Sequence, residues 1–450
     1  MRRTLQNLVG ELDRELLREH RFDTDLFGEL TAIQHDSGIL HGDRTISPFL
    51  RPYFLAESKY AAIRKVAALL AGAFGKLTSA ALENDSIMDE LGMSEKERRW
   101  ARLETGYRDV SVTSRLDTFL TEDSFAFLEY NGETPAGVGD QAALERLYSH
   151  IPTVRRFLAA NAHHYPQPHV SLISSLDQAY RESGGQKDKP NIAIVDWAGV
   201  STGAEFEILA DFFESLDYRT KICTPEELEY AGGVLTAGNF AIDVFYKRVI
   251  IHEFLDRFDE DHPVFRACTD GAVCMANSFR SKIPHKKSSF AILTDDRYQG
   301  LFDAHQLEAI RQHVPWTRNV QYGKTTYSGE AVDLVEFIRN ERHRFVLKPN
   351  DDYGGKGIKF GWETSGPDWD DAIEFALSEL YVVQERVPVE KTNIPVFADG
   401  EARMESLTVD FDPFLFRGVV EGGMVRLASG SLVNISQGGG ETALAILKGF

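Results

Sequence analysis

The sequence predicts a mixed α/β (α+β) protein, because different regions of the chain carry different hydrophobic periodicities. The first hundred residues place apolar side chains three and four positions apart, as at Leu8, Leu12 and Leu16, which indicates amphipathic helices. From Val110 polar and apolar residues alternate, which indicates strands. Residues 191–223 have the pattern strand, glycine loop, helix and strand, which predicts a βαβ unit, and the last hundred residues are dense in short strands and glycine.

Composition and charge argue against several classes of protein. With 49 lysines and arginines against 69 acidic residues, the formal net charge is -20, and no local basic patch would attract nucleic-acid phosphates. Three cysteines without zinc-type spacing predict neither a disulfide framework nor a structural metal site. The amino terminus carries charges where a signal peptide needs an apolar core, and the apolar run 61–77 still contains three basic residues. We therefore expect a cytoplasmic protein that binds neither nucleic acid nor membrane. The sequence leaves open whether the protein forms a homo-oligomer.

The clearest local signal is a buried strand that ends in a lysine and is followed by a glycine-rich turn. Glycine lets backbone N–H groups approach phosphate oxygens closely, and a lysine at the strand end supplies positive charge. Nucleotide phosphate is the ligand that suits this arrangement. The alternative is a plain β-hairpin with solvated lysines, since the spacing is neither that of a P-loop nor that of a kinase loop. The candidate residues are Lys348, Gly354, Gly355, Lys356 and Gly357.

A second signal is an early pair of strands with polar residues on one face. Asp117, Glu129 and Asn131 supply hard oxygen ligands of the kind that suit Mg²⁺. Arg115 can stabilise negative charge that develops on a transferred phosphoryl or acyl oxygen. If Asp117 pairs with Glu129, then Arg115 pairs with Asn131 on the same face. This register needs a turn of odd length, and a slip of one residue would separate the two pairs. The alternative is a solvated face with ordinary salt bridges.

The two signals together resemble the circularly permuted ATP-grasp ligases, the group that contains the amide-forming domain of glutathionylspermidine synthetase. In that family an R-x-D strand is followed, fourteen residues after the arginine, by E-Y-N and an acidic turn with proline. Here Glu129 lies fourteen residues after Arg115, and the chain continues Tyr-Asn-Gly-Glu-Thr-Pro. The family's glycine-rich phosphate loop follows downstream, as the segment after Lys348 does here. The resemblance covers roughly residues 105–450 and implies an ATP-grasp fold with permuted strand order, built from mixed and antiparallel sheets.

The resemblance also implies further site residues. A second nucleotide lysine precedes an apolar segment in these proteins, which favours Lys287 over its neighbour Lys286. A later strand resembles the edge that receives adenine, where Gln384 or Glu385 would orient the base, and an ordinary buried strand is the alternative. Arg426 resembles a substrate-contacting arginine, although an arginine on a strand is more often a salt-bridge partner.

Four regions follow from these assignments. At about 150 residues per domain, 450 residues favour two to four domains. A polar stretch at 160–190, with prolines and glycines, is the best linker candidate. We expect an amino-terminal helical region that is an appendage or a family-specific cap (1–105), a metal-site hairpin with the first part of the ATP-grasp core (106–185), a βαβ substrate subdomain (186–280), and a nucleotide-binding lid with the remainder of the core (281–450).

The activity that the resemblance implies is an ATP- and Mg²⁺-dependent ligation of a carboxylate to an amine through an acyl phosphate, with release of ADP and phosphate. ATP and Mg²⁺ would be the cofactors, and a small carboxylic acid and an amine would be the partners. Arg115 would stabilise the oxyanion of the tetrahedral intermediate, and residues 133–139 and 199–207 would line the amine side. Two alternatives stay open, a small-molecule kinase and a non-catalytic nucleotide-binding protein. A dinucleotide-dependent oxidoreductase ranks last, because the loop of the βαβ unit lacks G-x-G-x-x-G spacing.

Overall fold

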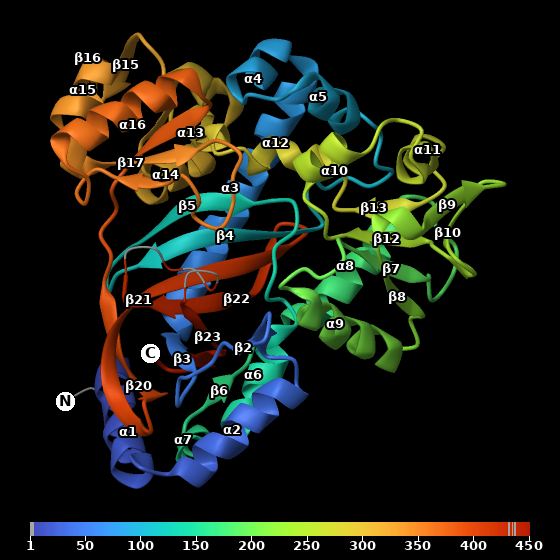
Figure 1. Cartoon of the computed structure of the whole chain (residues 1–450). Coiled ribbons are helices and arrows are strands. Elements are labelled where there is room, and N and C mark those ends of the chain that lie inside the picture. The colour runs from blue at the N-terminus through green and yellow to red at the C-terminus, as the bar shows by residue number, and fades with distance from the viewer. Residues whose placement is uncertain (1–3, 431–432, 434, 436–437) are drawn as a thin grey trace.

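The computed structural model describes residues 4–430, 433, 435 and 438–450, and its largest sheet has six antiparallel strands (Figure 1). The strand order is β23-β22-β21-β4-β5, and β20 pairs with the first half of β21. Because β4 pairs with β21, segments almost three hundred residues apart are neighbours in this central sheet. Its strands are β4 (Thr113–Leu120), β5 (Phe125–Asn131), β20 (Lys391–Ala398), β21 (Glu401–Phe416), β22 (Val419–Ala428) and β23 (Gly440–Thr442).

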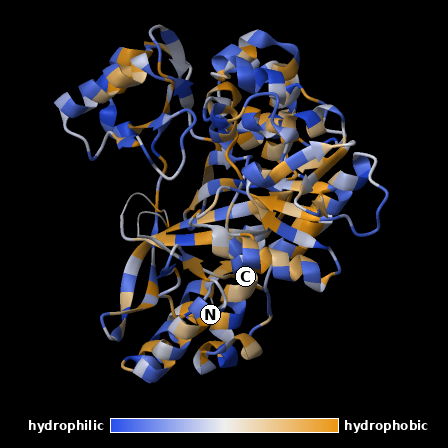
Figure 2. Cartoon of the chain, turned by 45° about the vertical axis from the view of Figure 1, so that its right-hand side comes forward, coloured by the Kyte–Doolittle hydropathy of each residue, from blue (hydrophilic) through white to orange (hydrophobic). Residues whose placement is uncertain are grey.

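One face of the central sheet is apolar and packs on the longest helix, α3 (Glu57–Glu83). Phe74 of α3 lies in the same buried cluster as Leu116, Phe127 and Phe411 of the sheet. Among the described residues, α3 is the one helix that is long and apolar enough to cross a membrane. Its apolar side is instead buried against the sheet, as in a core helix of a globular protein. Hydrophobic residues concentrate on the strands, and the outward helix faces are largely hydrophilic (Figure 2).

The amino-terminal region shares a sheet with the end of the chain, which contradicts the first of the two alternatives, an appendage. β3 (Tyr53–Ala56) pairs in parallel with β24 (Leu444–Leu447) near the end of the chain. β6 (His163–His164) pairs with the other edge of β24. The remaining elements of the region are α1 (Leu5–His20), α2 (Thr24–Asp36), β1 (Leu40–His41), β2 (Arg44–Thr45), α4 (Asp85–Glu90) and α5 (Glu95–Ala101).

A parallel sheet of order β13-β12-β7-β8 confirms the predicted βαβ unit. α9 connects β7 to β8, which pairs with one edge of β7, and the chain later returns to β12, which pairs with the opposite edge of β7. The carboxyl ends of β7 and β12 therefore form a switch point of the kind at which open α/β sheets bind ligands. The elements are β7 (Ile192–Val195), α9 (Gly203–Ser215), β8 (Thr220–Cys223), β12 (Val244–Lys247) and β13 (Cys274–Ala276).

The segment expected to be a linker contains a helix, α8 (Pro168–Glu182), so that expectation is wrong. Pro168 stands at the first helical position, where proline is well tolerated. α8 packs on both the central sheet and the βαβ subdomain and joins them firmly. The subdomain is completed by β9 (Leu228–Ala231), β10 (Val234–Ala237), β11 (Phe240–Ala241), α10 (Ile251–Arg257) and α11 (Pro263–Thr269).

The lid is a separate antiparallel sheet of order β14-β19-β17-β18, which stands above the central sheet in Figure 1. The lid has a hydrophobic cluster of its own, which includes the buried side chain of Trp369. The lid consists of β14 (Thr317–Asn319), β15 (Lys324–Tyr327), β16 (Glu330–Asp333), α15 (Leu334–Asn340), β17 (Phe345–Pro349), β18 (Lys359–Phe360), α16 (Gly366–Ser378) and β19 (Tyr381–Glu385). The other helices are α6 (Asp140–Ser149), α7 (Pro152–Ala160), α12 (Lys282–His285), α13 (Ser288–Leu293) and α14 (Ala304–His313).

Candidate functional site

The hairpin of β4 and β5 places four predicted site residues on one face of the central sheet. Asp117 pairs with Glu129, and Arg115 pairs with Asn131, so the predicted register is confirmed. The predicted odd turn is wrong, because four residues connect the strands. A β-bulge places one additional residue, Leu128, on β5 and restores the register beyond it.

Arg426 on β22 lies among the carboxylates of this face. Its Nη2 is 2.9 Å from Asp117, 2.6 Å from Asp410 and 2.7 Å from Asp412. Burial raises the pKa of Asp412 well above its usual range. For Asp117 burial acts in the same direction, but Arg426 and Arg115 outweigh it and lower the pKa. Arg426 is thus a salt-bridge partner in this structure, which is the alternative that the sequence left open.

Lys348 lies at the end of β17 and reaches from the lid to the hairpin. Its Nζ donates to Gln384 Oε1 at 2.7 Å and lies 3.5 Å from the carbonyl oxygen of Leu128. Burial lowers the pKa of Lys348 to about 8, although Glu129 acts in the opposite direction. An anionic ligand beside this amine would favour its charged form, as a nucleotide phosphate would.

Lys287 rather than Lys286 faces the hairpin. Lys287 Nζ lies 3.1 Å from Glu129 Oε1 and donates to the carbonyl oxygen of Asp352 at 2.7 Å. Lys286 instead donates to Glu97 on α5 at 2.8 Å. This geometry favours Lys287 as the second nucleotide lysine, and its role stays a prediction.

The turn after β17 has the backbone conformation for which glycine is suited. The φ angles of Gly354, Gly355 and Gly357 are 69°, 75° and 69°, a region that other residues rarely adopt. A Cβ atom at Gly357 would also come within 2.7 Å of Pro349 Cγ. The glycines therefore serve the shape of this turn, which we call the glycine loop (351–358).

The two candidate adenine residues lie on opposite faces of β19. Gln384 faces the hairpin, and its Nε2 donates to Thr317 Oγ1 at 3.1 Å. Glu385 turns the other way, accepts a hydrogen bond from Tyr327 and lies 3.4 Å from Arg344. Neither is among the described residues that line the cavity below. Their predicted contact with adenine stays a prediction.

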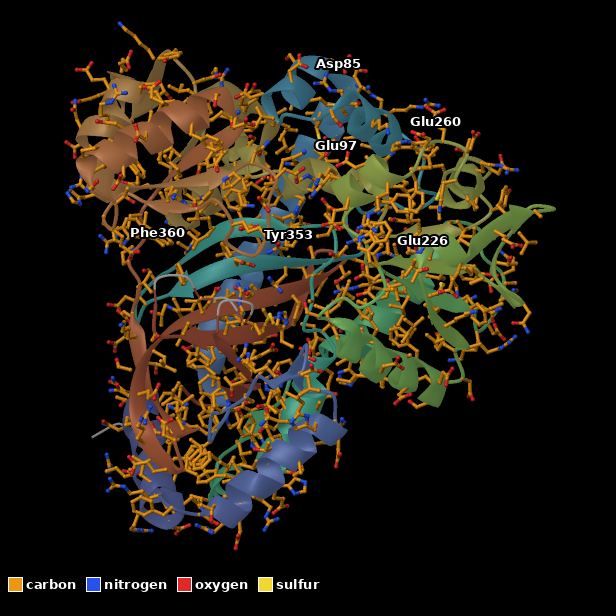
Figure 3. All side chains as sticks on the ribbon, in the orientation of Figure 1. Asp85, Glu97, Glu226, Glu260, Tyr353 and Phe360 are labelled. Carbon is orange, nitrogen blue, oxygen red and sulfur yellow. The ribbon has the colours of Figure 1, made fainter. Side chains whose placement is uncertain are left out.

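The hairpin, the glycine loop and the βαβ subdomain meet around one cavity of about 630 Å³. The βαβ subdomain contributes the loop after β7 and the first turn of α9, at the switch point of its sheet. Tyr353 lies at this junction, and Phe360 lies on the lid side (Figure 3). The predicted meeting of the early hairpin with the later lysine and glycine turn is therefore confirmed. The predicted residues on the cavity wall include Arg115, Asp117, Glu129, Asn131, Lys348, Gly354, Gly355, Lys356 and Arg426, and residues of the two predicted amine-side segments, 133–139 and 199–207, line it as well.

A buried ion-pair network at the base of the glycine loop was not predicted. The fully buried Lys282 lies 2.7 Å from Glu133 and 2.5 Å from Asp351. Lys286 lies 2.6 Å from Asp351 on its other side. Burial alone would raise the pKa of Glu133, but Lys282 lowers it to about 2. Glu133 belongs to the segment 133–139 that the sequence placed on the amine side, whereas no sequence pattern marks Lys282.

Asn277, which follows β13, holds the two ends of the hairpin together. Its Oδ1 accepts from the backbone N–H groups of Val112 at 2.6 Å and Thr113 at 3.1 Å. Its Nδ2 donates to the carbonyl oxygens of Thr113 at 2.6 Å, Gly132 at 2.8 Å and Glu133 at 3.1 Å. The side chain is fully buried. Asn277 thus fixes the hairpin to the βαβ subdomain, and no sequence signal marks this role.

Oxygen atoms near the hairpin are of the kind that binds a hard divalent cation such as Mg²⁺, but Arg426 already pairs with the three closest carboxylates. Carboxylate oxygens of Asp117, Asp410 and Asp412 all lie within 4.8 Å of one another. Asp410 Oδ1 is buried and has no hydrogen-bond partner among the described residues. Of the three predicted metal ligands, Asp117 belongs to this group, Asn131 donates to Asp117 at 2.7 Å, and Glu129 lies beside a lysine. The set of ligands stays a prediction.

Comparison with solved structures identifies the architecture. A glutathione synthetase-like effector from Globodera pallida, in its apo form, matches with a TM-score of 0.61 over 96% of this chain and 97% of that chain, at 13% sequence identity. The fold is ATP-grasp-like. At this level of identity the likeness concerns the architecture alone. In the ATP-grasp-like fold of this chain, the cavity lies where the lid approaches the central sheet.

Two mycobacterial proteins are similar in sequence. An uncharacterized protein of Mycobacterium tuberculosis is 26% identical over 345 residues, which is 70% of this chain and 56% of that protein. An uncharacterized protein of Mycobacterium leprae is 25% identical over 341 residues, which is 71% of this chain and 56% of that protein. The chain thus spans about half the length of the curated relatives it matches. No family model matches the chain.

Proposed function

We propose that this protein is an ATP- and Mg²⁺-dependent ligase that joins a carboxylate to an amine, of the circularly permuted type that includes the amide-forming domain of glutathionylspermidine synthetase. The observation that carries the proposal is the cavity shared by the hairpin acids, Lys348 and the glycine loop. The ATP-grasp-like fold supports it, and so does the motif spacing from Arg115 to Glu129. A cytoplasmic location, with its supply of ATP, belongs to the same proposal.

The nucleotide would lie between the lid and the hairpin. Lys348 and Lys287 would bind its phosphates, since both amines already reach the hairpin. Backbone N–H groups of Gly354 and Gly355 would cover the phosphates. Asp117, Glu129 and Asn131 would hold Mg²⁺, which would neutralise phosphate charge and orient the terminal phosphate.

The reaction would proceed in two steps in this cavity. The substrate carboxylate would attack the terminal phosphorus of ATP, which gives ADP and an acyl phosphate. The amine would then attack the acyl carbon, phosphate would leave, and an amide would form. Arg115 is 8% exposed and lines the cavity, so its guanidinium would act in a largely desolvated position on the tetrahedral oxyanion.

An ADP-release screen tests the proposal. The purified protein is incubated with ATP, Mg²⁺, single amino acids or short peptides as acids, and amines in pairwise combination. We expect at least one pair to give ADP and phosphate in equal amounts with an amide that mass spectrometry detects. A stable phosphorylated acid or alcohol in place of the amide would indicate a kinase.

Nucleotide binding provides a control that needs no substrate. Bound ATP with Mg²⁺ stabilises the folded state, by about 2.7 kcal/mol at one hundred times the dissociation constant. We therefore expect a clear rise in the melting temperature, and little rise in a Lys348→Ala variant. An unchanged melting temperature of the wild type at millimolar ATP and Mg²⁺ would contradict the ligase and the kinase alike.

A further inference from the structure

The carboxylate of Glu253 connects the glycine loop to the βαβ subdomain. The hydroxyl of Tyr353 donates to Glu253 Oε1 at 2.8 Å. The indole N–H of Trp197 donates to Glu253 Oε2 at 2.8 Å. Trp197 follows β7, Glu253 lies on α10, and Tyr353 belongs to the glycine loop, so one carboxylate joins three elements around the cavity.

The subdomain side of this connection is packed among aromatic side chains. The guanidinium carbon of Arg257 lies 3.9 Å from the centre of the Trp197 ring, a cation–π contact. Phe254 of α10 and Phe258, the residue after this helix, stack near the same ring, with centroid distances of 6.4 Å and 6.0 Å. Glu253 is therefore presented by a packed aromatic cluster.

The loop side is held differently at its base and at its tip. At the base, Asp351 is fixed by Lys282 and Lys286 at 2.5 Å and 2.6 Å. Toward the tip, Tyr353 is 39% exposed. Burial of its ring and the bond to Glu253 raise its pKa to about 12, so the hydroxyl stays a donor at neutral pH. Tyr353 thus ties the upper part of the loop to the βαβ subdomain across the cavity.

We propose that Tyr353 and Glu253 are positioning residues that keep the glycine loop closed against the βαβ subdomain while the acyl phosphate is present. This inference rests on the proposed ligase function. Without the closed loop, water would add to the acyl carbon, the bond from this carbon to the bridging oxygen would break, and phosphate, the free carboxylate and a proton would be released. ATP would then be consumed without amide formation, so the connection determines coupling rather than the rate of phosphoryl transfer.

An activity assay tests the proposal by measuring the coupling ratio, which is the amount of ADP formed per amide. Tyr353→Phe removes only the hydroxyl and keeps the ring, and Glu253→Ala removes the acceptor from the other side. We expect the ratio to rise from about one in the wild type to two or more in each variant, with little change in the KM for ATP. The double variant should match Glu253→Ala, because the hydroxyl then has no acceptor to lose. Tyr322→Phe, at an exposed tyrosine of the lid, is the matched control and should keep the wild-type ratio.

Hydrogen exchange of residues 351–358 tests the same connection without substrates. Loss of one hydrogen bond should speed exchange of these amides roughly three- to tenfold in Tyr353→Phe, and Tyr322→Phe should leave it unchanged. Exchange equal to that of the wild type would overturn the inference whether or not the ligase reaction exists. A wild type that forms no amide, with faster loop exchange in Tyr353→Phe, would refute the proposed function and the coupling role, and only the structural connection would stand. A wild type that forms amide, with an unchanged ratio in Tyr353→Phe, would overturn the inference alone.

Discussion

Replacement of Asn277 by alanine should loosen the hairpin that carries the candidate metal ligands. This side chain makes five hydrogen bonds to backbone groups, two as acceptor and three as donor. They connect the first residues of the hairpin segment, near Val112, to the chain just beyond β5, at Gly132. Alanine would leave buried backbone groups without these partners.

The expected loss follows from the number and burial of these bonds. A typical intramolecular hydrogen bond contributes about 0.5–1.5 kcal/mol net, and an unsatisfied buried group costs about 1–3 kcal/mol. Some of the backbone groups will find water or relax, so the five bonds do not add fully. We expect Asn277→Ala to lower the free energy of local opening of β4 and β5 by about 3–4 kcal/mol. Displacement of the hairpin should also weaken ATP binding at least tenfold.

Hydrogen exchange of the β4 and β5 amides measures the local loss, and calorimetric titration with ATP and Mg²⁺ measures the functional one. Asn191→Ala is the matched control, because Asn191 Nδ2 makes one such bond, to the carbonyl oxygen of Ala241 at 2.8 Å. This control should lose about 1 kcal/mol near its own site and bind ATP normally. If Asn277→Ala changes the β4 and β5 amides by less than about 1 kcal/mol, the bonds seen here do not hold the hairpin.

Three further predictions concern the cavity itself. Asp117→Ala and Glu129→Ala should each abolish turnover while the melting temperature stays within a few degrees, and full turnover in either variant would mean that the residue is misassigned. ATP affinity should fall about tenfold per pH unit above pH 8, because Lys348, with its pKa lowered to about 8, must take up a proton to bind phosphate. Calorimetry in two buffers at pH 8.5 should show this proton uptake. An affinity for ATP that rises above pH 8 would contradict the prediction. Arg426→Met should lower the free energy of urea unfolding by about 3–5 kcal/mol, because it leaves buried carboxylates without the guanidinium that pairs with them. An unchanged free energy of unfolding would show that Arg426 does not balance the charge of these carboxylates.

The parts of the site that the sequence predicted are local in the chain. The register of β4 and β5 follows from alternation and from the spacing of Arg115 and Glu129, which lie close enough in sequence to constrain each other. The positive φ angles of the glycine loop likewise follow from the glycines themselves. Even here the structural cause of the register differs from the predicted one, because a bulge at Leu128, and not a turn of odd length, sets it.

The parts that were missed depend on contacts between distant segments. The pairing of β3 with β24 joins the two ends of the chain, and four-residue strands carry no information about their partner. Arg426 contacts Asp117 across the central sheet, although 309 residues separate them. Periodicity gives the side of a strand on which an arginine lies, but the neighbouring strand decides which acids it meets.

The segment from α10 to Lys287 holds the hairpin and the glycine loop in position relative to each other. Asn277 fixes the ends of the hairpin, Lys282 holds the base of the glycine loop through Asp351, and Glu253 holds Tyr353 above it. The hairpin and the loop each carry recognisable sequence patterns, yet they do not position each other by local structure alone. A chain with both patterns but without these three side chains would keep the chemical groups of the site and lose their common cavity. We therefore expect substitutions in this segment to impair coupling and binding, although no sequence motif marks it.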